Sequence, residues 1–279
     1  MPKNVVVVLL DSLNRHMLGA YGGREFDTPN LDRFAKRAVR FDRHYTGSLP
    51  CMPARHDILC GSWDFLWRPW GSIEVWEEPI TRHLRLADVT TMLVSDHPHL
   101  FETGGENYHT DFTAWDYVRG HEDDPWRTSR DTSWVGAPAV PADESWVARH
   151  YDVTRTWFKK EEDFPGARTM ARAADWLELQ APVDGRFMLF VDEFDPHEPF
   201  DVPEPWMSMY DPDWEGPKVI WPPYAADAVG SGRLDARTAR HIRANYGAKL
   251  SFIDHWFGRL LDVLDRKNIW NDTAVIVCT

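Results

Sequence analysis

The sequence is poor in cysteine, in excess positive charge and in long hydrophobic runs. Three cysteines, Cys51, Cys60 and Cys278, are too few for a disulfide framework. The formal net charge of −13 disfavours nucleic acid and anionic membrane surfaces as partners. No apolar run reaches the length of a membrane span, and Val5–Leu10 is too short for the core of a signal peptide. We therefore expect a cytoplasmic protein without membrane or nucleic-acid partners.

At 279 residues, of which 43% are hydrophobic, the chain can bury a substantial core. The run Val5–Leu10 does not alternate between apolar and polar residues, which is typical of a strand covered on both faces in a parallel sheet. Further strands are expected at Thr90–Val94, Phe187–Val191 and Thr273–Thr279, the last one also buried. Strands that alternate with helices predict one α/β domain over residues 1–279, with a mostly parallel central sheet and helices on both faces.

Apolar residues at helical spacing predict the helices of this domain. They are expected at Thr28–Phe41, Pro53–Cys60, Ala167–Leu177 and Asp235–Lys267. Residues 100–165 and 201–232 are rich in Trp and Pro and lack such a pattern. We interpret both stretches as loop-rich insertions.

The pentapeptide Cys51–Arg55 combines a cysteine, a proline two residues later and an arginine four residues later. Pro53 fits the first turn of a helix, so Cys51 is expected at or just before a helix N-terminus. Free backbone N–H groups favour an anion there, and Arg55 adds a forked cation suited to a tetrahedral oxyanion or a carboxylate. The alternative interpretation is a buried structural thiol.

Polar residues follow three of the predicted strands. Asp11 follows the first, His97 and His99 follow the second, and the segment Asp192–His197 follows the third. Ligands of open α/β sheets bind at the carboxyl ends of the strands, so these side chains are expected to meet at one edge. A carboxylate beside an oxyanion site requires a cation between them, and we therefore infer a divalent metal.

Each of these residues also has a structural interpretation. Asp11 could cap a helix, His97 and His99 could be exposed loop residues, and His197 could occupy a turn between prolines. Their occurrence together with the pentapeptide favours a functional site.

Several segments together resemble the N-terminal catalytic portion of a sulfatase, in the alkaline-phosphatase-like superfamily. Cys51, Pro53 and Arg55 match the signature in which the cysteine is oxidised to formylglycine. The other matching segments are Asp11 after the first strand, Thr28–Asp32, Asp195–Pro199 as a His-x-Pro segment, Tyr246–Leu264, Trp270–Thr273 and the final strand.

This resemblance implies a mechanism. A formylglycine-generating enzyme would oxidise Cys51, and one hydroxyl of the hydrated aldehyde would attack the sulfur of a sulfate monoester. Asp11 and residue 51 would bind the metal, Ca²⁺ in the first place, with Mg²⁺ or Mn²⁺ as alternatives. Arg55 would steady the diol. His197, with His97 or His99, would bind sulfate oxygens or protonate the leaving alcohol, which belongs to a sulfated small molecule or carbohydrate.

Three features depart from the family pattern. Ser12 stands where a second aspartate is usual, and Asp96–His99 replaces a Lys-x-His segment. The family continues after the last strand with an Asp/Asn-His-Gly segment and a small C-terminal subdomain, whereas this sequence reaches Thr279. We therefore expect an incomplete, truncated catalytic domain. Two alternatives stay open: a phosphonate or phosphate monoester hydrolase of the same superfamily, and a catalytically inactive anion-binding protein.

Overall fold

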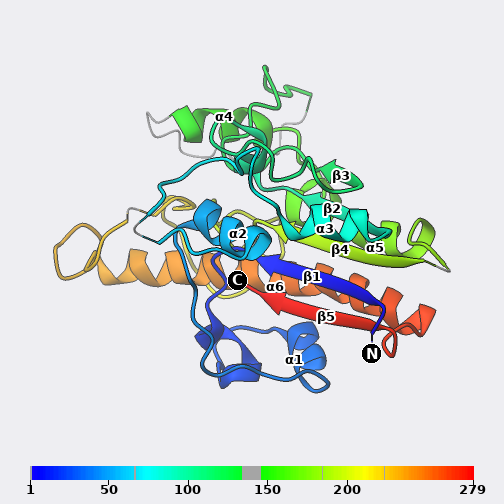
Figure 1. The fold of residues 1–279 in the computed structure, drawn as a ribbon. Coiled ribbons are helices and arrows are strands. Elements are labelled where there is room, and N and C mark those ends of the chain that lie inside the picture. The colour runs from blue at the N-terminus through cyan, green and yellow to red at the C-terminus, as the bar shows by residue number, and fades with distance from the viewer. Residues whose placement is uncertain (1, 66, 134–145, 184, 223) are drawn as a thin grey trace.

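A five-stranded sheet forms the centre of the protein. The structure, a computed structural model, describes residues 2–65, 67–133, 146–183, 185–222 and 224–279. The strands lie in the order β3-β2-β4-β1-β5, and every strand pair is parallel (Figure 1). The predicted α/β fold with a parallel sheet is therefore confirmed. The strands are β1 (Asn4–Leu10), β2 (Val89–Ser95), β3 (Ala114–Tyr117), β4 (Arg186–Glu193) and β5 (Thr273–Cys278).

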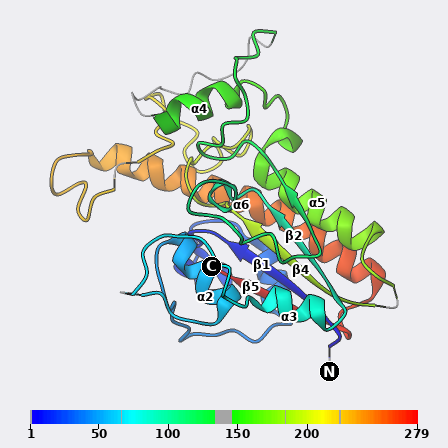
Figure 2. The ribbon, with the colours of Figure 1, turned by 45° about the horizontal axis from the view of Figure 1, so that its top comes forward.

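Helices cover both faces of the sheet (Figures 1 and 2). Val6 and Val8 of β1 belong to the core cluster of α5 (Pro165–Leu179) and α6 (Ala236–Lys267). Val7 and Leu9 belong to a second cluster with α2 (Cys51–Cys60) and α3 (Ile80–Leu86). Successive residues of a strand face opposite sides, so a continuous apolar run is what this central strand needs. In the described part of the chain, no helix is both long and apolar enough to span a membrane.

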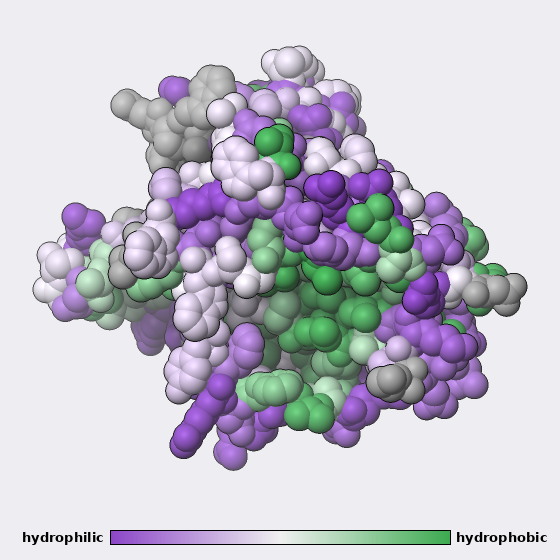
Figure 3. Space-filling view, viewed as in Figure 1, coloured by the Kyte–Doolittle hydropathy of each residue, from purple (hydrophilic) through white to green (hydrophobic). Residues whose placement is uncertain are grey.

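The two faces are covered unequally. The helices α5 and α6 have 15 and 32 residues, whereas α2 and α3 have 10 and 7. On the face drawn in Figure 3, hydrophobic residues gather in the middle of the view, where Figure 1 shows β1 and β5. Ile276 of β5 is 49% exposed and Leu86 of α3 is 74% exposed. The α2 side of the sheet is therefore the thinner layer.

The prediction that the last strand is buried was wrong. β5 pairs with β1 alone among the described strands, and its burial is only partial. A β-branched run such as Thr273–Cys278 does not distinguish a central strand from an edge strand, because both are extended and apolar. The helix expected to reach Phe41 also ends earlier, since α1 spans Pro29–Ala35. Its first turn is the part held on α6, where Asp254 accepts the backbone N–H groups of Asn30 and Leu31.

The stretch 100–165 is less irregular than its composition predicts. It contains β3 and the helix α4 (Trp146–Arg155), and the helix α3 was also not predicted. A strand of four residues and a helix of two turns are too short to show a periodic pattern. Within 201–222 and 224–232 there is neither a helix nor a strand. Four short 3₁₀ helices complete the described elements, at Arg15–Met17, Gly19–Tyr21, Pro98–Phe101 and Glu161–Asp163.

Candidate active site

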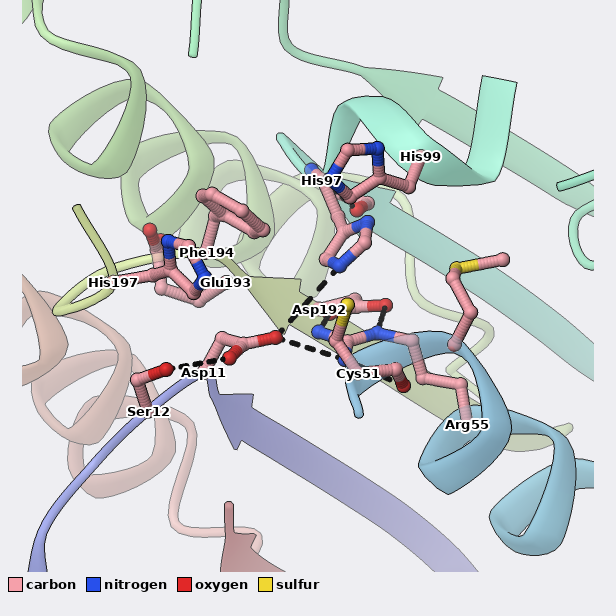
Figure 4. Close-up of polar contacts among 12 residues, drawn as sticks. Asp11, Ser12, Cys51, Arg55, His97, His99, Asp192, Glu193, Phe194 and His197 are labelled. Carbon is pink, nitrogen blue, oxygen red and sulfur yellow. Dashed lines mark hydrogen bonds and ion pairs between the residues drawn. The ribbon is translucent and has the colours of Figure 1, made fainter. Parts of the chain in front are cut away.

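The carboxyl ends of three strands and the start of one helix meet at one edge of the sheet (Figure 4). Asp11 directly follows β1, and His97 follows β2 by two residues. Asp192 lies near the end of β4. The helix α2 begins at Cys51, with Pro53 in its first turn, as the pentapeptide predicts. Segments that are distant in sequence thus bring their polar residues together, as expected for parallel strands.

Arg55 links these segments through its whole guanidinium group. Its Nε and Nη2 donate to the two carboxylate oxygens of Asp192 at 2.8 and 2.6 Å. Its Nη1 lies 2.9 Å from Oδ2 of Asp11 and donates to the carbonyl oxygen of Cys51 at 3.1 Å. Arg55 is only 3% exposed. We call Arg55, Asp11 and Asp192 the Arg55 cluster; with both carboxylates ionised, its net charge is −1.

Asp11, Cys51 and His97 present donor atoms to one another. One atom of each residue lies within 4.8 Å of the others, and Nε2 of His97 is 3.7 Å from Oδ2 of Asp11. His97 is fully buried, and neither of its ring nitrogens has a hydrogen-bond partner. Burial lowers the pKa of His97, so its ring is neutral, and burial raises the pKa of Cys51 to about 12. The hydroxyl of Ser12 donates to Oδ1 of Asp11 at 3.1 Å.

His99 and His197 lie in the next layer, around the ring of Phe194. The ring centroids of His97, His99 and His197 lie 4.7, 6.1 and 4.3 Å from that of Phe194. His197 donates from Nδ1 to the carbonyl oxygen of Glu198 at 2.9 Å. The structure therefore brings Asp11, Cys51, Arg55 and His97 into direct proximity, and it places His99 and His197 beside them.

His99 is held between two carboxylates. Its Nδ1 lies 2.5 Å from Glu102 and its Nε2 lies 3.1 Å from Glu122. Burial favours the neutral ring, but the hydrogen bond and charge of Glu122, together with Glu102, outweigh it and raise the pKa of His99 to about 9. At neutral pH, His99 is therefore the protonated histidine beside this site, whereas His97 is neutral.

A family model matches nearly the whole chain. The family model described as Sulfatase matches residues 3–279.

The chain belongs to the sulfatase family.

Among curated sulfatases, it is 26% identical to the uncharacterized sulfatase YidJ of Escherichia coli, over 96% of this chain and 55% of that protein. It is 24% identical to human iduronate 2-sulfatase, over 98% of this chain and 53% of the relative. The choline-sulfatase of Rhizobium meliloti is 25% identical, over 99% of this chain and 56% of the relative. The chain thus spans about half the length of the curated relatives it matches.

Solved structures of this superfamily share the fold. The phosphonate monoester hydrolase of Agrobacterium radiobacter has a TM-score of 0.65 and 18% identity, covering 99% of this chain and 62% of that one. A protein in complex with its substrate D-glucosamine-2-N,6-O-disulfate has a TM-score of 0.66 and 14% identity, covering 99% of this chain and 64% of that one. At these identities the likeness shows the alkaline-phosphatase-like fold alone.

The residues of this chain fit the divalent metal that the sulfatase family implies. Both ring nitrogens of His97 are buried without hydrogen-bond partners, and Oδ2 of Asp11, which is paired with Arg55, lies 3.7 Å from Nε2 of His97. The Arg55 cluster places two buried carboxyl groups against one guanidinium, and residue 51 adjoins it. Buried polar atoms are normally partnered and buried charges neutralised, so a cation at this point would satisfy both requirements.

Lys249 and His121, which the sequence did not assign to the site, form a second buried charge cluster with Asp195. Nζ of Lys249 lies 2.7 Å from Asp195 and donates to the carbonyl oxygen of Pro199 at 2.6 Å. Nε2 of His121 lies 2.7 Å from the same Asp195 oxygen. We call Lys249, Asp195 and His121 the Lys249 cluster. Its signal in the sequence was a lysine between Ala248 and Leu250 on an otherwise apolar helix face, because a lysine is rarely buried unless it is paired.

Asp96 and Glu193 form a buried pair of carboxyl groups beside these clusters. Neither residue is exposed, and the backbone N–H of Phe194 donates to Asp96 at 2.8 Å. Burial, followed by the negative charge of Asp195, raises the pKa of Asp96 to about 7. Burial, followed by the charge of Asp96, also raises the pKa of Glu193 well above its ordinary value. The pair therefore retains a proton at neutral pH and does not add two charges to the site.

Proposed function

We propose that this chain carries the catalytic site of a sulfuric ester hydrolase in which Cys51 is converted to formylglycine. The observation that supports this most directly is the position of Cys51 in the first turn of α2, with Arg55 bound to its carbonyl oxygen and Asp11 beside it. Membership of the sulfatase family supports it independently. The enzyme that would act on Cys51 is a formylglycine-generating enzyme.

Asp11 and residue 51 are the proposed metal-binding residues. Asp11 offers carboxylate oxygens, Ser12 a hydroxyl, and residue 51 an oxygen once it is modified. Oxygen donors of this kind suit Ca²⁺, which takes six to eight of them, with Mg²⁺ or Mn²⁺ as alternatives. A bound cation would supply positive charge that stabilises an ionised hydroxyl at residue 51. Arg55 keeps residue 51 in place, because Asp192 holds its guanidinium from the opposite side.

The three histidines near residue 51 have different proposed roles. His99 is protonated at neutral pH, and Glu102 and Glu122 hold its two ring nitrogens, so its proposed role is to supply positive charge beside the sulfate oxygens. His197 donates from Nδ1 to the carbonyl oxygen of Glu198, which fixes its ring, so its Nε2 is the nitrogen proposed to bind a sulfate oxygen or to protonate the leaving alcohol. His97 is neutral and buried, and it faces Asp11 and Cys51 from β2.

The proposed substrate is a sulfate monoester of a small molecule or carbohydrate. Relatives named for iduronate and choline sulfates support this class without selecting one member of it.

The test has two stages. The chain is coexpressed with a formylglycine-generating enzyme, and mass spectrometry of the peptide with Cys51 is expected to show the change from thiol to aldehyde. Rates are then compared on an aryl sulfate and on an aryl phosphonate monoester with the same leaving group. Faster sulfate hydrolysis supports the proposal. Faster phosphonate hydrolysis would instead identify the chain as a phosphonate monoester hydrolase. An unmodified thiol at Cys51 under these conditions would refute the formylglycine mechanism.

A further inference from the structure

The site of the unmodified chain differs chemically from the site after conversion. Before oxidation, residue 51 offers a sulfur atom, and the neighbouring donors are Oδ2 of Asp11 and Nε2 of His97. These three atoms come from the first residue of α2 and from residues that closely follow β1 and β2, so the sheet and this helix position them (Figure 4). Sulfur, imidazole and carboxylate form a donor set of Zn²⁺, whereas Ca²⁺ takes oxygen donors only.

The spacing of the donors suits a small tetrahedral ion. Zinc lies about 2.0 to 2.3 Å from such donors, which places the donors of a tetrahedron roughly 3.3 to 3.8 Å apart. Nε2 of His97 and Oδ2 of Asp11 are already 3.7 Å apart, and Sγ of Cys51 lies within 4.8 Å of both residues' donor atoms. A shift of about 1 Å by the Cys51 side chain therefore completes three corners, because its χ1 angle can rotate.

His97 is the decisive observation. It is 0% exposed, its ring has no hydrogen-bond partner on either nitrogen, and Nε2 lies 3.7 Å from Oδ2 of Asp11. An imidazole without partners in the interior is unusual, since buried polar groups are nearly always satisfied.

We propose that the chain with an unmodified Cys51 binds one Zn²⁺ through Cys51, Asp11 and His97, and leaves the fourth position open. On binding, the Sγ–H bond breaks, the Zn–Sγ bond forms and the proton passes to solvent. Arg55 stays on Asp192, which binds it through two hydrogen bonds. Zinc would then occupy the sulfur that a formylglycine-generating enzyme has to oxidise, so a zinc-bound chain would resist conversion.

Co²⁺ is the probe for this site, because it occupies the same kind of coordination site as Zn²⁺ and gives a charge-transfer absorption with a thiolate ligand. The chain is produced without the modifying enzyme, stripped of metal with a chelator and titrated with Co²⁺. We expect one equivalent to produce the thiolate absorption, and one equivalent of Zn²⁺ to abolish it. Cobalt binding without this absorption, or an absence of binding, would overturn the proposal.

Matched variants locate the site. Cys51→Ser is expected to remove the absorption, and Cys60→Ser on the same helix is expected to retain it. His97→Ala should weaken Zn²⁺ binding at least about 100-fold in calorimetry, because even residues that only support a ligand cost 10- to 100-fold. His197→Ala, on the other side of Phe194, should bind Zn²⁺ as the parent does. Retention of the absorption in Cys51→Ser would place the metal elsewhere.

Folding of each variant is checked by circular dichroism and thermal unfolding. Asp11→Asn serves as a second ligand variant if His97→Ala does not fold. Zinc binding is measured on the unconverted chain, and sulfate hydrolysis is measured on the converted chain. Failure of one proposal therefore leaves the other intact.

Discussion

The Arg55 cluster and the Lys249 cluster lie only three residues apart along the chain, at Asp192 and Asp195, yet they differ in charge balance. Both are buried at the carboxyl end of β4. In the Lys249 cluster one ammonium meets one carboxylate. His121 is neutral there, because burial, followed by the charge of Lys249, lowers its pKa to about 4. The Arg55 cluster holds two carboxylates against one guanidinium.

This difference separates a structural ion pair from a binding site. Charges that cancel need no external partner, and the Lys249 cluster joins α6 to the loop after β4 through Asp195 and Pro199. A cluster with a residual negative charge, next to a histidine without partners, requires a cation or a substrate to complete it. The comparison predicts that changes in the Arg55 cluster affect chemistry and stability together, whereas changes in the Lys249 cluster affect stability alone.

The largest effect is expected from Cys51→Ala, compared with the parent after conversion of its Cys51. Removal of the nucleophile should lower kcat about 10⁴-fold or more. Stability should change little, because Arg55 contacts Cys51 through its backbone carbonyl oxygen and not through sulfur. Steady-state rates and urea unfolding measure the two quantities. Cys60→Ala, at the other end of α2, is the control and should retain activity; equal losses in both variants would contradict a chemical role for Cys51.

Arg55→Met is expected to cause the largest loss of stability. It leaves Asp11 and Asp192 buried without their cation, and breaking a buried ion pair by removing one partner costs about 3 to 5 kcal/mol. Chemical denaturation measures the loss. Arg55→Lys keeps the charge but loses the forked contacts, so its stability should be intermediate between those of the parent and of Arg55→Met. A loss below about 1 kcal/mol would show that the cluster is not the anchor that its contacts indicate.

The loss of stability in Lys249→Met should lie at the lower end of the same range of about 3 to 5 kcal/mol, because Asp195 retains His121 as a partner. Turnover per folded molecule should stay within a few-fold of the parent. The double variant Asp195→Asn with Lys249→Met removes both charges and should recover part of the lost stability. If turnover falls in Lys249→Met as steeply as in Arg55→Met, the distinction between the two clusters fails.

The two clusters were also unequally predictable from the sequence. Asp11, Cys51 and Arg55 could be placed because strand ends and a helix start carry local signals in the residues themselves. The sequence does not show that Asp192 binds the guanidinium of Arg55, since that contact joins residues 137 positions apart. His121 follows the four-residue strand β3, which is too short to predict, so its approach to Asp195 depends on packing that only the tertiary structure fixes.

The same reasoning accounts for the fold. Long apolar runs such as β1 and the amphipathic pattern of α6 predict the sheet and its cover, because burial imposes their spacing. The edge position of β5 and the end of α1 at Ala35 depend on which elements pack beside them, and the residues of these two segments do not predict those neighbours.

The smallest effect concerns His99, whose raised pKa makes stability depend on pH. Its folded pKa of about 9 lies above the ordinary value of 6.5, so the charged ring stabilises the fold. This contribution is complete below pH 6.5 and is lost as pH rises through about 9. His99→Gln should therefore destabilise the chain on the order of 1 to 2 kcal/mol at pH 6, and less at pH 10. Urea unfolding of both chains across this range measures the difference, with the exposed His83→Gln as control. A difference that stays constant with pH would mean that Glu102 and Glu122 do not hold a proton on His99, and His99 would then lose its proposed role as a positive charge beside the sulfate oxygens.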